Sequence, residues 1–186
     1  DATHWPAAMP IQQGGDQIMI KNGSIRYYGA FEYQRIGDNV NLISVVTMQD
    51  YLKGVICFEM SNTWPLEALK TQAICARGYA ARNFGKHSSD GFDLCSSTHC
   101  QVYKINSTLE SAQVAQAVDE TNGMVVTYNG SLAETLYSAS TPGHTESNSY
   151  VWGTTAYPYL QSVEDTWQPD VNNWDVTLTR SQLAQK

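Results

Sequence analysis

The sequence has no long apolar run, few charged residues and few cysteines, and these shortages exclude several classes of protein. No stretch of the 186 residues approaches the roughly 18 consecutive apolar residues of a membrane-spanning helix. Charged side chains make up 16% of the chain, and the net charge of −7 disfavours nonspecific binding to nucleic acid or an anionic membrane surface. A neutral or partly cationic partner, such as a sugar chain, fits this charge. Because the sequence begins with Asp1, we expect any signal or anchor segment to lie outside it.

Length and composition predict a globular protein with its own core. A chain of 186 residues can bury roughly 70% of its unfolded surface without disulfides or metal ions, and a hydrophobic fraction of 42% is ordinary for this class. Residues 1–15 combine prolines and glycines with little periodicity, so we expect an irregular N-terminal arm there. Residues 16–186 are expected to form one domain.

Short runs of β-branched and aromatic residues predict antiparallel strands. Residues 17–20 and 24–28 flank Asn22-Gly23, a dipeptide typical of hairpin turns. A second hairpin is expected around Asn129-Gly130. The remaining strand signals lie at residues 31–36, 40–46, 124–128 and 131–138.

Capping signals predict helices between these strands. Thr47, with Asp50 three residues later, opens a helix that runs to about Glu59. Pro65 suits the first position of a second helix, with Thr63 or Trp64 as its cap and Gly85 at its end. The buried face of this second helix is expected to consist of Leu66, Leu69, Ala73, Ala76, Ala80 and Phe84.

A third helix is expected from the Ser107 and Glu110 capping signature to about Glu120. Because the strand runs and the helical blocks do not alternate regularly, the fold class is expected to be α+β. We expect a single domain in which antiparallel hairpins and two or three helices flank a substrate groove.

Glu59 stands at the expected end of the first helix, with Val55, Ile56, Phe58 and Met60 as apolar neighbours. Burial among such side chains disfavours the charged carboxylate and raises its pKa. A carboxyl group that stays protonated near neutral pH can act as the general acid in cleavage of a glycosidic bond. The alternative is an ordinary helix-end glutamate that caps a neighbour or faces solvent.

Four ordered motifs carry a family resemblance. G-V-I-C-F-E-M-S at 54–61 precedes W-P-L-E-A-L-K-T-Q-A-I-C-A-R-G-Y-A at 64–80, and both belong to the first motif. The other three are D-L-C-S-S-T-H-C-Q-V-Y at 93–103, A-V-D-E-T-N-G at 117–123 and S-A-S-T-P-G-H-T-E at 138–146. Together they closely resemble the sporulation stage II protein D family of peptidoglycan lytic transglycosylases, over roughly two thirds of the chain.

The resemblance implies a mechanism with one catalytic carboxyl group, Glu59. Glu59 is expected to protonate the oxygen between N-acetylmuramic acid and N-acetylglucosamine, and then to assist attack by the muramoyl 6-hydroxyl, which gives a 1,6-anhydro product. Arg77 is expected to orient the substrate through its planar fork, and the alternative is that it anchors helix packing. Tyr103 is expected to bind substrate.

Cys95, His99 and Cys100 lie within six residues, and His87 precedes them by eight. Two thiolates and two imidazoles complete a tetrahedral zinc set, and a closed site of this kind is structural because no position remains for water. If three of the four bind, the open position suits a metal hydrolase. A Cys95–Cys100 disulfide is the other alternative, and so short a loop contributes about 2 kcal/mol against on the order of 10 kcal/mol for zinc. The family resemblance favours zinc.

Cys57 and Cys75 lie among apolar helical residues and are expected to be core thiols.

The resemblance places the turn at 138–146 in the catalytic groove, with Ser138, Ser140 and His144 expected to bind substrate. Small hydroxyl groups and a glycine suit contacts with sugar hydroxyls and N-acetyl groups, although Pro142 removes one backbone donor. A Ser/His hydrolase is the sharper alternative, but the G-x-S-x-G motif is missing. The plain alternative is a tight turn with a surface histidine.

Two functional classes stay open. One is an enzyme that cleaves glycan strands, and the other is a non-catalytic, glycan-binding activator of a cell-wall amidase, because some relatives of the resembled family are described as amidase enhancers. The expected partners are peptidoglycan glycan strands and other cell-wall hydrolases, and nucleic acid is not expected. The expected location is extracytoplasmic, at the cell wall or held at a membrane through a segment outside this sequence.

Overall fold

The computed structural model describes residues 4–5, 17–19, 26–104, 111–166 and 175–183. The chain divides into two compact units, Asp1–Tyr137 and Ser138–Lys186, and the domain predicted over 16–186 covers parts of both. Unit 2 holds α4 (Asn148–Trp152) and α5 (Arg180–Leu183). Unit 1 holds β1 (His4–Trp5), β2 (Gln17–Met19), β3 (Arg26–Tyr28), β4 (Ala30–Ile36), β5 (Asn39–Val45), α1 (Met48–Glu59), α2 (Leu66–Arg82), a 3-10 helix (Ser88–Asp90), α3 (Ala112–Glu120), β6 (Thr127–Tyr128) and β7 (Ser131–Leu132).

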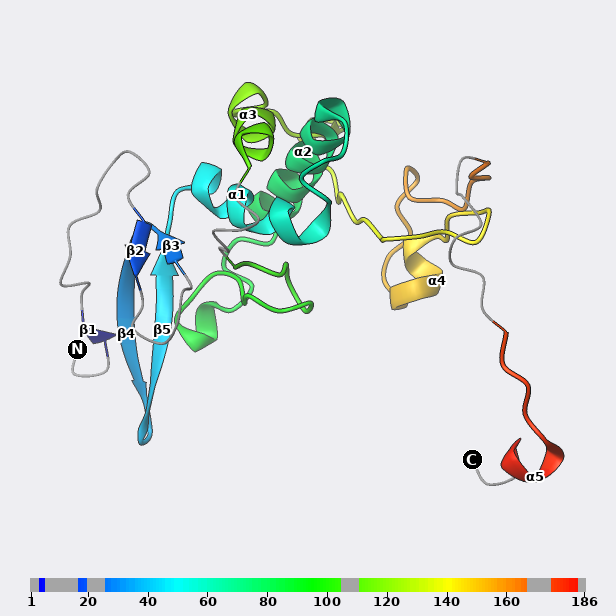
Figure 1. Cartoon of the computed structure of the whole chain (residues 1–186), viewed down its shortest axis with the longest axis horizontal. Coiled ribbons are helices and arrows are strands. Elements are labelled where there is room, and N and C mark those ends of the chain that lie inside the picture. The colour runs from blue at the N-terminus through cyan, green and yellow to red at the C-terminus, as the bar shows by residue number, and fades with distance from the viewer. Residues whose placement is uncertain (1–3, 6–16, 20–25, 105–110, 167–174, 184–186) are drawn as a thin grey trace. The chain divides into compact units, whose positions relative to one another are not determined.

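The strands pair antiparallel, and together with the helices they confirm the predicted α+β class. β4 and β5 form a long hairpin (Figure 1) whose register runs from Ala30 opposite Val45 to Ile36 opposite Asn39. β2 pairs with β3 as predicted, while the turn at Asn22-Gly23 lies outside the described residues. Of the predicted arm at 1–15, His4 and Trp5 are described, and they form β1 against β4.

The capping signal at Thr47 is confirmed. The Thr47 Oγ1 atom accepts from the backbone N–H of Asp50 at 3.2 Å, and the hydroxyl donates to Asp50 Oδ2 at 2.9 Å. These bonds satisfy a free N–H group of the first turn, so α1 begins at Met48. It ends at Glu59, where the sequence predicted its end.

α2 differs from its prediction at both ends. Pro65 is the cap residue rather than the first helical residue, and its carbonyl accepts from Leu69 N at 3.2 Å. The helix ends before Gly85 because both the backbone N–H and the side-chain amide of Asn83 bond to Tyr79 O, at 3.0 and 2.9 Å. Phe84 therefore lies past the helix and is 72% exposed, so its predicted place on the buried face is wrong.

α3 begins later than the capping signature predicts. Ser107 and Glu110 lie outside the described residues, and Ser111 is the cap, with Oγ accepting from Gln113 N at 3.2 Å. The predicted end at Glu120 is confirmed. β6 and β7 confirm the second hairpin but are shorter than predicted, and both turn residues, Asn129 and Gly130, have positive φ (49° and 78°), as a type I′ turn requires.

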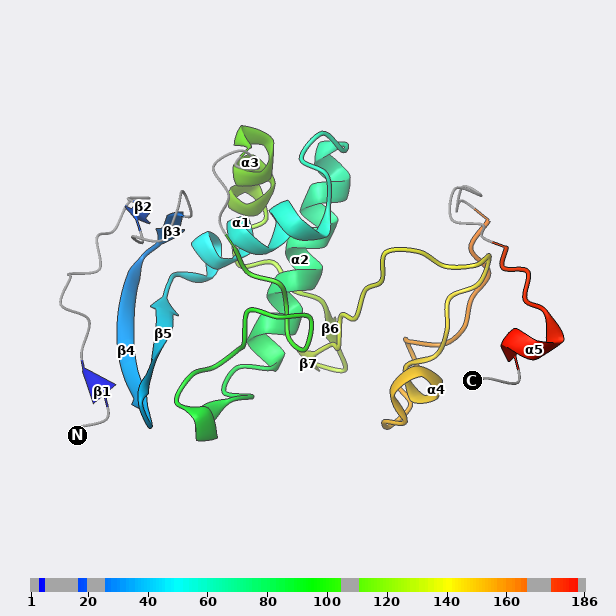
Figure 2. The ribbon, with the colours of Figure 1, turned by 60° about the horizontal axis from the view of Figure 1, so that its bottom comes forward.

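The three longer helices pack against one another and form the core of unit 1 (Figures 1 and 2). Gly54 lets α1 approach the chain after the cysteine loop, because a Cβ there would lie 2.5 Å from Tyr103 Cε2. No helix of the described part of the chain is both long and apolar enough to span a bilayer. The buried cluster consists of Leu52, Val55, Ile56, Leu69, Ala73, Ala76, Tyr103, Val114, Ala117 and Val118.

Candidate functional site

Glu59 is a partly buried carboxyl group at the C-terminal end of α1. The backbone becomes extended at Met60, with φ −138° and ψ 152°, so the helix stops at this point. Val55 and Ile56, one turn earlier, are 0% exposed. Burial raises the pKa of Glu59 above its ordinary value, in the direction that the sequence predicts. A helix C-terminus also disfavours negative charge, so the location suits a proton donor.

Tyr137 lies against Glu59. Its hydroxyl hydrogen-bonds to the carboxyl group and partly offsets the rise in pKa that burial causes. Burial raises the pKa of Tyr137 itself to about 12, so this hydroxyl keeps its proton at neutral pH. Tyr137 is missing from the predicted site residues, and the signal that marks it is its place directly before the motif at 138–146.

Gln101 lies behind Tyr137 and is 2% exposed. Its Nε2 atom donates to the Tyr137 hydroxyl at 3.0 Å and to the carbonyl of Ala76 at 3.3 Å. Its Oε1 atom accepts from the Tyr51 hydroxyl at 3.0 Å. Gln101 is also missing from the predicted site, although it lies inside the motif at 93–103. The structure thus joins α1, α2 and the segment after β7 through one buried amide.

Tyr103, predicted to bind substrate, lies in the core of unit 1. Its side chain is 6% exposed, and its ring stacks on Tyr51 with a centroid distance of 5.1 Å. The same ring packs against Gly54. A ring enclosed in this way has almost no surface left for a ligand, so we infer that Tyr103 supports α1 from inside.

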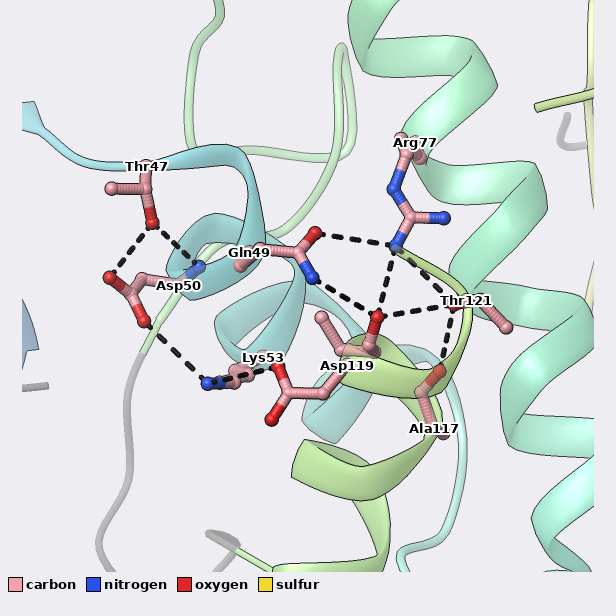
Figure 3. A network of polar contacts seen from close by, with 9 residues as sticks. Thr47, Gln49, Asp50, Lys53, Arg77, Ala117, Asp119 and Thr121 are labelled. Atoms are coloured by element: carbon pink, nitrogen blue, oxygen red, sulfur yellow. Dashed lines mark hydrogen bonds and ion pairs between the residues drawn. The ribbon is translucent and has the colours of Figure 1, made fainter. Parts of the chain in front are cut away.

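Arg77, also predicted to bind substrate, is 4% exposed and lies where α1, α2 and α3 meet (Figure 3). Its Nη1 atom donates to Met124 O at 3.0 Å. Its Nη2 atom donates to Val118 O at 3.3 Å and to Thr121 Oγ1 at 3.3 Å. A longer contact of 3.4 Å joins Nη2 to Gln49 Oε1. These contacts support the alternative that the sequence left open, in which Arg77 anchors helix packing.

The motif at 117–123 forms the other side of this contact. Thr121 donates to Ala117 O at 2.7 Å and caps the last turn of α3. Lys53 of α1 lies 3.6 Å from the Asp119 carboxylate (Figure 3). A guanidinium beside the free carbonyls of a helix C-terminus is electrostatically favoured. The motif at 117–123 and the arginine of the 64–80 segment therefore form one packing unit.

The cysteine loop brings together the four predicted metal ligands His87, Cys95, His99 and Cys100, whose donor atoms all lie within 4.8 Å of one another. His87 Nε2 lies 3.3 Å from His99 Nδ1 and 3.5 Å from Cys100 Sγ. His99 Nδ1 lies 3.7 Å from each of the two sulfurs. In a tetrahedral zinc site, with Zn–S about 2.3 Å and Zn–N about 2.0 to 2.1 Å, neighbouring ligand atoms lie about 3.3 to 3.8 Å apart. The donor set therefore fits zinc.

The surroundings of the loop also fit a metal site. Asp90 Oδ2 lies 3.0 Å from His87 Nδ1, so the carboxylate holds the proton on Nδ1 and leaves Nε2 free as a ligand. Burial raises the pKa of Cys95, but hydrogen bonds with Ser97, His99 and Cys100 outweigh it and bring the pKa down to about 6. All four cysteines of the chain carry free thiols. Cys57 packs against the core as predicted, and burial raises the pKa of Cys75.

Ser138, Ser140 and His144 belong to unit 2 and are exposed. The turn that carries them is held by the segment 161–165 of the same unit, where Thr145 N donates to Val163 O at 2.8 Å. His144 forms an isolated bridge with Glu164. Their predicted part in substrate binding stays a prediction, made for exposed side chains on an ordered turn.

Comparison with known proteins confirms the family resemblance. Residues 37–128 match the family model of stage II sporulation proteins, SpoIID, and this segment contains Glu59 and the whole cysteine loop. This chain belongs to that family through the matched segment. The Stage II sporulation protein D of Bacillus subtilis is 30% identical over 148 residues, which cover 72% of this chain and 43% of the relative.

Two further relatives match more closely in sequence. The Amidase enhancer of Bacillus subtilis is 40% identical over 135 residues, which cover 73% of this chain and 18% of the relative. An uncharacterized protein of Brachyspira hyodysenteriae is 35% identical over 161 residues, which cover 86% of this chain and 43% of the relative. The chain thus spans less than half the length of these curated relatives.

Proposed function

We propose that this chain acts on the bacterial cell wall as a peptidoglycan lytic transglycosylase with Glu59 as its acid and base. The observation that supports the proposal most directly is the pairing of Glu59 with Tyr137, because burial raises the pKa of the carboxyl group while the phenol fixes its position. The membership of residues 37–128 in the SpoIID family supports the cell-wall role. The proposed location is extracytoplasmic.

In the proposed reaction, protonated Glu59 gives its proton to the oxygen that links N-acetylmuramic acid to N-acetylglucosamine. The bond from this oxygen to C1 of the muramic acid breaks, and the N-acetylglucosamine leaves as an alcohol. The carboxylate then takes the proton of the muramoyl 6-hydroxyl while O6 bonds to C1. Glu59 ends protonated, and no water is consumed, so one carboxyl group suffices where a hydrolase ordinarily uses two.

A second candidate function is supported by the relative named Amidase enhancer, which is 40% identical to this chain. Under this proposal the chain binds glycan strands and activates a cell-wall amidase without cleaving glycan itself. Glu59 would then be a leftover of the enzyme, and other cell-wall hydrolases would be the partners.

Digestion of purified glycan strands, with and without stem peptides, distinguishes these candidates. We expect products with 1,6-anhydro ends, separated by liquid chromatography and identified by mass. New reducing ends would show hydrolysis instead. Strands that stay intact, together with a stimulated amidase in a mixed assay, would favour the activator.

We also propose that His87, Cys95, His99 and Cys100 hold one structural zinc ion. The metal would tie the loop after α2 together and would supply no chemistry to the reaction, because four protein ligands leave no open position. The same loop carries Gln101, the residue directly after Cys100.

The metal proposal predicts about one zinc per chain by elemental analysis. Chelation should lower the melting temperature by at least about 5 °C, because the site contributes folding energy. Cys95→Ser should lose the zinc, whereas Cys75→Ser, outside the donor cluster, should keep it. A metal-free protein with a Cys95–Cys100 crosslink in a peptide map would contradict the proposal.

A further inference from the structure

The hydrogen bonds of Gln101 have a defined direction. Ala76 O is a backbone carbonyl and can only accept, so the amide nitrogen of Gln101 must face it, at 3.3 Å. The amide oxygen then faces Tyr51 and accepts from that hydroxyl at 3.0 Å. A fixed backbone acceptor and a buried phenol thus determine which way the side-chain amide is turned.

This orientation determines where the proton of Tyr137 lies. The second N–H of Gln101 donates to the Tyr137 oxygen at 3.0 Å, so that oxygen acts as an acceptor toward Gln101. The hydroxyl proton of Tyr137 must then point elsewhere, and its partner is the carboxyl group of Glu59. The chain of donors therefore runs from Gln101 through Tyr137 to Glu59.

We propose that Gln101 is a positioning residue for the acid of this site: it holds Tyr137 as a donor to one oxygen of Glu59, so that the acidic proton occupies the other oxygen. The inference rests on the proposed function. An undirected phenol could instead accept the acidic proton from Glu59 and keep it from the substrate. With Gln101 in place, Tyr137 cannot turn its oxygen toward the carboxyl proton without losing the bond to the amide.

A double-mutant cycle tests this role. Gln101→Met keeps the length of the side chain and removes its hydrogen bonds, and we expect kcat to fall about tenfold with KM within about twofold. In the Tyr137→Phe background the same change should cost less than about twofold, because Gln101 acts through the hydroxyl that is already gone. Equal losses in both backgrounds would overturn the proposal and leave Gln101 as a packing residue.

Tyr51→Phe is the matched control. It removes a bond of 3.0 Å from the same amide but leaves the bonds of Nε2 to Ala76 and Tyr137 in place, so kcat should stay within about twofold. A loss equal to that of Gln101→Met would mean that any damage to this buried amide has the same effect. Failure of both Gln101→Met and Gln101→Leu to fold would also count against positioning.

A measurement without turnover separates this inference from the proposed function. The carboxyl carbon of Glu59 can be titrated by NMR, and Gln101→Met should raise its pKa because the directed donation from Tyr137 is weakened. Burial raises the pKa of Tyr137 to about 12, so the phenol stays neutral through this titration. An unchanged titration overturns the inference. A shifted titration in a protein that cleaves no glycan would retain the geometry and refute the transglycosylase.

Discussion

Glu59→Gln is expected to reduce glycan cleavage at least about 100-fold while the protein stays folded, because an amide can neither give nor take the proton. Burial raises the pKa of Glu59, so the folded state disfavours the carboxylate at neutral pH. The stability that protonation of this group provides is fully present at low pH and is lost as the pH rises through the raised pKa. Glu59→Gln should therefore melt no earlier than the native chain at pH 7, and this advantage should shrink as the pH falls.

Glu67→Gln is the control for this experiment. Glu67 stands in the first turn of α2, is exposed, and lies 2.8 Å from Lys70. An exposed pair of this kind contributes little, so both activity and melting temperature should stay close to those of the native chain. Cleavage above about 5% of the native rate in Glu59→Gln would refute the role of Glu59 as the acid.

Arg77→Ala is expected to cost at least about 3 kcal/mol of unfolding free energy, which corresponds to roughly 6 to 12 °C in melting temperature. The change removes the guanidinium from the contact of three helices and leaves the carbonyls of Val118 and Met124 without this donor. Arg77→Lys should lose roughly half as much, because one ammonium cannot reach acceptors on two sides. Activity should fall only in step with the folded fraction.

Arg82→Ala provides the matched control on the same helix. Arg82 pairs with Glu134 at 2.7 Å, but its side chain is 32% exposed, so its loss should cost about 1 kcal/mol or less. If Arg77→Lys instead abolished cleavage with an unchanged melting temperature, Arg77 would be a substrate-binding residue, as the family resemblance implies.

Much of the fold follows from local signals in the sequence. The cap at Thr47 and the hairpin turn at Asn129-Gly130 work through neighbouring atoms, and the structure confirms both. Glu59 could be singled out for the same reason, because its apolar neighbours are adjacent in the chain. The cysteine loop gathers its four donors within a short segment, and so its residues could also be predicted as a group.

The remaining features depend on contacts between distant segments. Gln101 and Tyr137 are 36 positions apart, and neither residue type marks a site by itself. The burial of Arg77 follows from where α3 ends, 41 to 47 positions later. Phe84 has the right spacing for a buried face, but the side chain of Asn83 ends the helix first. Periodicity cannot show such an end.

The last residue of unit 1 has a practical consequence for the choice of protein boundaries. The family match stops at residue 128, whereas the unit continues to Tyr137. The extra segment supplies Thr135, which donates to Cys75 O at 2.7 Å, as well as the phenol beside Glu59. A shortened protein that ends at residue 128 would keep Glu59 and the four metal donors yet lack the hydroxyl that orients the acid. Expression of an active fragment therefore calls for a C-terminal boundary beyond residue 137.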